Sequence, residues 1–130
     1  MKTGARELLR FIERRGIPAA LVTSTRRSTA EEKLERNQLL DHFQFLVCGG
    51  EAPRGKPEPD PYLFAASGLA INPAACWALE DSANGVRAAH SAGCTVYQVP
   101  DLVPPSPEIR ELGHRIVDSL HDVLAALERL

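Results

Sequence analysis

The sequence predicts an α/β fold in three layers, with a parallel sheet that carries helices on both of its faces. Short apolar runs alternate along the chain with segments of helical periodicity. The apolar runs are nearly continuous, which is typical of strands that are covered on both faces of a sheet. The chain has 130 residues, enough for one hydrophobic core and too few for two, so we expect residues 1–130 to form a single domain.

Each element follows from a local pattern. Helices are predicted where apolar residues recur at helical spacing, and strands where a short apolar run stands between polar turns. Ser28 with Glu31 forms a predicted capping box, and Asp60 before Pro61 a predicted N-cap. The predicted helices are residues 3–15, 28–38 and 60–67, the segment from Asp81 to Gly93, a short helix after Ser106 and a last helix after Ser119. The predicted strands are residues 18–22, 45–48, 76–79, 95–99 and 116–117.

Composition excludes several classes of function. The chain has 15 Lys+Arg against 17 Asp+Glu and only 5% aromatic residues, so neither phosphate contacts nor base stacking would support a nucleic-acid partner. No apolar run approaches the roughly 20 residues of a membrane-spanning helix. The three cysteines are far apart and form no paired motif, which indicates free thiols in a reducing compartment. We therefore expect a cytoplasmic protein without a nucleic-acid or membrane partner.

Polar side chains follow the predicted strands at the points where chemistry is expected in a parallel sheet. The first strand is followed by Thr23, Ser24, Thr25 and Arg26, whose hydroxyl and backbone N–H groups could hold a phosphate oxygen or simply form an ordinary turn. Lys56 lies in a loop stiffened by prolines. It could supply a fixed positive charge to a phosphoryl group, or it could be a solvated surface lysine.

The third strand ends in two adjacent acidic residues, Glu80 and Asp81. Two neighbouring carboxylates repel each other unless a cation lies between them, and oxygen ligands suit Mg²⁺. The alternative is a helix N-terminus with an acidic cap, where Asp81 or Ser82 serves as N-cap of the following helix, which would explain one of the two acids. A hydroxyl donor, a fixed lysine and an acidic pair that could bind a metal are together the kinds of group that phosphoryl transfer uses.

Three stretches, residues 21–25, 55–62 and 79–93, resemble the haloacid dehalogenase (HAD) superfamily, in the subfamily of β-phosphoglucomutase-like enzymes and sugar-phosphate phosphatases. The resemblance implies a HAD-like, Rossmannoid core and Mg²⁺-dependent hydrolysis of a small phosphorylated metabolite such as a sugar phosphate. Thr23 would donate its hydroxyl to the phosphoryl oxygen, and Lys56 would neutralise charge on the nucleophile and phosphate. Glu80 and Asp81 would hold Mg²⁺, and residues 24–26 would contact the substrate.

The sequence departs from the family in two respects. It has no Asp-x-Asp motif on a first strand, which in the family supplies the nucleophile and the general acid–base residue, and it has no cap domain. We therefore expect a partial core that lacks the first central strand. Such a chain should not hydrolyse phosphate esters alone, and a missing N-terminal segment or self-association would have to fill the strand position.

Two other interpretations remain. A regulatory protein without catalytic activity could keep the phosphate and metal site after losing the nucleophile. A response-regulator receiver domain also combines acids, a hydroxyl and a lysine around Mg²⁺, but there the acids come early and the lysine last. In this chain the hydroxyl comes first and the acids third.

Overall fold

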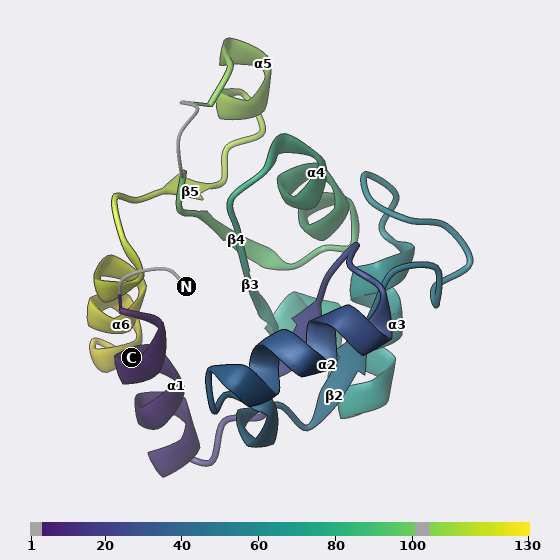
Figure 1. The fold of residues 1–130 in the computed structure, drawn as a ribbon. Helices are drawn as coiled ribbons and strands as arrows, with labels where there is room; N and C mark the ends of the chain where they lie inside the picture. The colour runs from purple at the N-terminus through teal and green to yellow at the C-terminus, as the bar shows by residue number, and fades with distance from the viewer. Residues whose placement is uncertain (1–3, 101–104) are drawn as a thin grey trace.

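The computed structural model describes residues 4–100 and 105–130 (Figure 1). Helices and strands alternate along the chain in the predicted order, so the α/β class is confirmed. The elements in chain order are α1 (Ala5–Arg14), β1 (Ala20–Val22), α2 (Arg27–Arg36), the 3-10 helix η1 (Leu40–His42), β2 (Phe45–Val47), α3 (Asp60–Leu69), the 3-10 helix η2 (Pro73–Ala75), β3 (Trp77–Glu80), α4 (Ala83–Ser91), β4 (Thr95–Gln98), α5 (Pro107–Arg110), β5 (Arg115–Ile116) and α6 (Leu120–Glu128).

The strands form two separate pieces of parallel sheet. β1 pairs with β2, with Leu21 opposite Leu46, and the second piece has the order β3-β4-β5. Within the described residues β1 pairs only with β2, and β3 only with β4. All three residues of β1 are half-buried, although parallel strands are usually covered on both faces. An unpaired strand edge in each piece agrees with the expected absence of a central strand.

Helices cover both faces of the β3-β4-β5 piece, which makes the three layers. Neighbouring residues of β4 point to opposite faces, so Val96 and Tyr97 belong to different parts of the core. One part brings Tyr97 and Val99 against α1 and α6, through Leu8, Leu120 and Val123. The other part brings Ala78 and Val96 against α4 and α5, through Val86, Ala89 and Ile109. Figure 1 shows α1 beside α6, with the β3-β4-β5 piece between these helices and α4.

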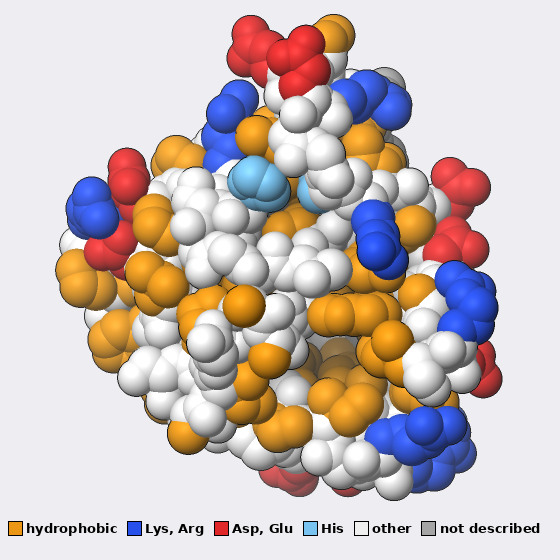
Figure 2. All heavy atoms as spheres, turned by 180° about the vertical axis from the view of Figure 1, so that it is seen from behind, with side chains coloured by type: hydrophobic (Ala, Val, Ile, Leu, Met, Phe, Trp, Pro, Cys, Tyr) orange, Lys and Arg blue, Asp and Glu red, His pale blue; other side chains and the backbone are white. Residues whose placement is uncertain are grey.

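The molecule is hollowed on one face. Figure 2, seen from behind the view of Figure 1, shows a recess with walls that are largely hydrophobic. Leu63 and Phe64 of α3 are large hydrophobic residues that are both 44% exposed. Apolar surface that stays open to water costs free energy that a further packed element would recover.

The helices are short. The longest, α1, α2 and α3, have ten residues each. In the part of the chain that the structure describes, none is both long and apolar enough to cross a membrane.

Two predicted helix caps are wrong. Helix α2 begins at Arg27 rather than at a Ser28 cap, because the Ala30 N–H already donates to the Arg26 carbonyl at 2.9 Å. Asp60 is the first residue of α3 rather than its N-cap, and its carboxylate binds the Arg54 guanidinium instead. The cap before α5 is confirmed, since Ser106 accepts a hydrogen bond from the Ile109 N–H, and Ser119 forms a capping box with Asp122. An ion pair six residues apart and an earlier backbone hydrogen bond thus override these local capping patterns.

Replacing Val86 with alanine tests the core between α4 and the sheet. Val86 is fully buried, so Val86→Ala should lower the free energy of unfolding by about 2 kcal/mol through lost burial and a cavity. Urea unfolding followed by circular dichroism measures this change. Leu130, which is 85% exposed, is the control, and Leu130→Ala should change the free energy by less than about 0.5 kcal/mol. Equal effects of the two variants would contradict this assignment of the core.

Candidate functional site

Lys56 joins the two pieces of sheet. Its ammonium group donates hydrogen bonds to the Val22 carbonyl at 3.2 Å and to Glu80 Oε2 at 2.5 Å. Val22 is the last residue of β1 and Glu80 the last of β3, so one side chain spans the carboxyl ends of both strands. The side chains of Lys56 and Glu80 are only 12% and 7% exposed. Lys56 is therefore a buried, fixed cation and not a solvated surface lysine.

The Glu80 carboxylate is enclosed by two further residues. The hydroxyl of Tyr62, in α3, donates to the same oxygen, Oε2. Gly85, in the first turn of α4, lies so close that a Cβ there would overlap the carboxylate. Burial, together with the negative charge of Glu80, raises the pKa of Tyr62, so this phenol remains a hydrogen-bond donor at neutral pH. Sequence reasoning did not assign a role to Tyr62 or Gly85, because only the folded chain places them beside Glu80.

The turn after β1 is held by a backbone hydrogen bond to β2 and by the Thr23 side chain. The Thr23 N–H donates to the Val47 carbonyl at 2.9 Å, and Thr23 Oγ1 accepts from the Thr25 N–H at 3.1 Å. Thr23 Oγ1 acts only as an acceptor in this contact and donates to no other described residue, so the Thr23 hydroxyl hydrogen remains available to a ligand oxygen. Ser24 and Arg26 are exposed, and within the described residues their side chains make no hydrogen bond. The turn directly follows Val22, so it begins beside the Lys56 ammonium group.

Asp81 and Glu80 have different surroundings. Asp81 is exposed, and its carboxylate has no hydrogen-bond partner among the described residues. It is not the cap of α4, since Ser82 accepts the hydrogen bond from the Gly85 N–H at 3.1 Å. Of the two caps that the sequence offered for α4, Ser82 is therefore confirmed and Asp81 is wrong. Glu80 is neutralised by Lys56, whereas Asp81 presents a free carboxylate at the same strand end.

The donor chemistry at this strand end suits a hard cation. The chain offers carboxylate oxygens, which Mg²⁺ prefers, and Mg²⁺ usually keeps several water ligands. Among residues 4–100 and 105–130, no group of three or more His, Cys, Asp or Glu side chains could hold a metal ion. Of the acidic pair, Asp81 is the residue whose carboxylate no described residue engages.

A family model of the haloacid dehalogenase-like hydrolases matches residues 1–93. Among curated proteins, the chain is 34% identical over 128 residues to a phosphorylated carbohydrates phosphatase of Thermotoga maritima, covering 98% of this chain and 59% of that protein. It is 35% identical over 121 residues to a bifunctional riboflavin kinase/FMN phosphatase of Arabidopsis thaliana, covering 92% of this chain and 32% of that protein. The chain therefore spans less than two thirds of the length of either relative.

Solved structures agree in fold. A putative β-phosphoglucomutase from Thermotoga maritima superposes with a TM-score of 0.89 at 33% identity, over 98% of this chain and 60% of that one. CbbY from Rhodobacter sphaeroides, in complex with xylulose-1,5-bisphosphate, superposes with a TM-score of 0.82 at 30% identity, over 91% of this chain and 53% of that one. With the family model matching most of the sequence, the chain belongs to the haloacid dehalogenase-like hydrolase family.

Proposed function

We propose that this chain is the C-terminal part of the core of a Mg²⁺-dependent phosphatase that acts on a small phosphorylated metabolite. One observation carries the proposal: Lys56 is buried between the carboxyl ends of β1 and β3, bound to Val22 and Glu80. A buried ammonium group at the edge where parallel strands end supplies positive charge where a phosphoryl group would bind. The names of the relatives, which include phosphatases of phosphorylated carbohydrates and of FMN, support the choice of substrate class.

Thr23 and Lys56 are the residues proposed to act on the phosphoryl group. The Thr23 hydroxyl would donate to a phosphoryl oxygen with the hydrogen that the Thr25 contact leaves available. Lys56 has three ammonium hydrogens, of which two go to Val22 and Glu80, so the third can bind the phosphoryl group. Ser24, Thr25 and Arg26 would complete the substrate contacts. The exposed Arg26 guanidinium is suited to a second anionic group on the substrate.

Asp81 and Glu80 are the proposed metal-binding residues, with unequal roles. The free Asp81 carboxylate is the better Mg²⁺ ligand, because Glu80 already accepts hydrogen bonds from Lys56 and Tyr62. Bound Mg²⁺ would offset the negative charge of the phosphoryl group. Glu80 would act mainly by holding Lys56 in place.

The nucleophile would come from outside these residues. The unpaired edges of β1 and β3 leave the position of one strand open, and an Asp-x-Asp segment placed there would adjoin Lys56 and Thr23. That segment would be an N-terminal extension or a second chain. We also infer a cytoplasmic location, which suits the three free thiols, Cys48, Cys76 and Cys94.

A second candidate is a regulatory protein that binds phosphate and Mg²⁺ without hydrolysis. The absence of an Asp-x-Asp motif from the 130 residues favours it. A receiver-type signalling domain is no longer a candidate, because the chain belongs to the hydrolase family.

A phosphatase assay with Mg²⁺ and a panel of sugar phosphates tests the proposed function. The 130-residue chain should release no more phosphate than its Lys56→Met variant, which controls for contaminating enzymes. The protein expressed with the coding sequence upstream of Met1 should release phosphate, and Lys56→Met should lower its kcat by about 100-fold or more. If the 130-residue chain released phosphate and Lys56→Met abolished that release, the inference that the chain lacks a nucleophile would be contradicted. An upstream sequence without an Asp-x-Asp strand would favour the regulatory protein.

Binding of inorganic phosphate tests the site on the 130-residue chain itself. Lys56→Met should raise the dissociation constant about tenfold, because the ammonium group contributes a charged hydrogen bond. Lys33 is an exposed lysine of α2 and provides the matched control, since Lys33→Met removes the same charge away from the site. Titration by NMR at fixed ionic strength measures both constants, and equal values for the two variants would contradict the site.

Removal of the Tyr62 hydroxyl tests the enclosure of Glu80. Tyr62→Phe should lower the free energy of unfolding by about 2 kcal/mol, because a buried carboxylate loses a hydrogen bond. Tyr97→Phe is the matched control: its hydroxyl binds Arg115, an exposed residue that water can solvate instead, so the loss should stay below about 1 kcal/mol. Urea unfolding at pH 7 measures both changes, and a larger loss for Tyr97→Phe would refute the assignment.

A further inference from the structure

The turn that follows β1 rests against the turn that follows β2. The Gly49 N–H donates to the Thr25 carbonyl at 2.7 Å. A Cβ on Gly49 would overlap the Ser24 carbonyl oxygen and lie 3.0 Å from its carbon. The two turns therefore meet backbone to backbone, and the conformation of residues 23–26 depends on where Gly49 is held.

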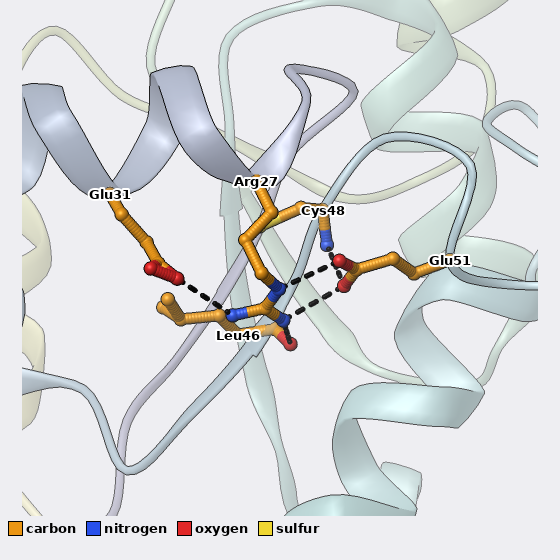
Figure 3. Close-up of polar contacts among 5 residues, drawn as sticks. All are labelled: Arg27, Glu31, Leu46, Cys48 and Glu51. Carbon is orange, nitrogen blue, oxygen red and sulfur yellow. Dashed lines mark hydrogen bonds and ion pairs between the residues drawn. The ribbon is translucent and has the colours of Figure 1, made fainter.

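An ion pair fixes the turn that contains Gly49 (Figure 3). Arg27 Nε donates to Glu51 Oε2 at 2.7 Å, and Arg27 Nη2 donates to Glu51 Oε1 at 2.8 Å. Glu51 Oε1 also accepts from the Cys48 N–H at 2.9 Å, while Arg27 Nη2 donates to the Leu46 carbonyl at 2.9 Å. Arg27 is the first residue of α2. Through its pair with Glu51 it binds the turn on both sides of Gly49.

The arrangement of this pair suits positioning more than stabilisation. The Arg27 and Glu51 side chains are 43% and 32% exposed, and ion pairs in contact with water contribute little to stability. The bidentate contact nevertheless fixes the relative orientation of the two side chains, because the guanidinium and carboxylate groups are both planar. The hydrogen bonds from Arg27 lower the pKa of Glu51, so the pair stays ionised at neutral pH.

Arg27 is not available to bind substrate directly. Its Nε and Nη2 are engaged by Glu51 and Leu46, and its Nη1 lies 3.5 Å from Glu31 Oε1. In this respect it differs from the neighbouring Arg26, whose side chain makes no hydrogen bond with the described residues.

We propose that Arg27 and Glu51 are positioning residues for phosphate binding. By holding Gly49 against Thr25, they keep residues 23–26 in the conformation that receives the phosphoryl group, without touching it. The role of that turn in phosphate binding rests on the proposed function. The mechanical link from Arg27 to Thr25 is independent of it.

Hydrogen exchange of the Gly49 amide, measured by NMR on the 130-residue chain, tests the mechanical link. Arg27→Met and Glu51→Gln should each accelerate this exchange at least about tenfold and leave amides of the buried strand β4 unchanged. Arg36→Met is the matched control, because Arg36 forms a similar pair with Glu32 on the same helix, at 2.7 Å and away from both turns. Gly49 exchange at the wild-type rate in both Arg27→Met and Glu51→Gln would overturn the proposal.

The dissociation constant for inorganic phosphate tests whether the positioning affects phosphate binding. Glu51→Gln removes a negative charge, so electrostatics alone predicts tighter phosphate binding, whereas loss of positioning predicts binding weaker by about fivefold or more. Weaker binding by Glu51→Gln, with an unchanged unfolding midpoint, would support positioning. Tighter or unchanged binding would overturn it. If the wild-type chain binds no phosphate but the Gly49 amide responds as expected, the mechanical link stands and the proposed function fails.

Discussion

The structure depends on one buried ammonium group shared between two strand ends. A lysine and a glutamate that are each about nine-tenths buried are costly unless each neutralises the other and their remaining polar atoms are bonded. Lys56 meets this condition with Glu80 and Val22, and Tyr62 supplies the further bond to the carboxylate. One ammonium group therefore ties the ends of β1 and β3 to each other. The groups that follow these strands, on the Thr23 turn and at Asp81, take their places from it.

Two glycines allow the close contacts in this arrangement. At Gly85 the missing side chain leaves room for the Glu80 carboxylate under the first turn of α4, and at Gly49 it lets two backbone turns touch. Neither glycine has the positive φ angle that usually explains the residue. In both places the requirement is close approach, which a single added carbon would prevent.

The two pieces of sheet give the proposed function a physical basis. Strand edges with unpaired backbone groups are normally covered, paired or charged, because they otherwise invite association with another strand. Among residues 4–100 and 105–130, β1 is half-buried and pairs only with β2, and its carboxyl end is bound by Lys56. One added strand would satisfy the backbone of both pieces and bring its own side chains to the proposed phosphate site. Stability and activity would then both require the added strand.

The order of the elements follows from the amino-acid sequence alone, and one site at the strand ends is predicted from it. Apolar runs define strands, and the carboxyl ends of parallel strands meet at one edge, so Thr23, Lys56 and Glu80 could be assigned to a common site before the structure was known. The bonding partners of these residues follow from the tertiary fold. It joined Lys56 to a carboxylate 24 residues away, added Tyr62, left Asp81 free and started α2 at Arg27. These outcomes depend on contacts between segments distant in sequence, and local periodicity and capping patterns describe only neighbours along the chain.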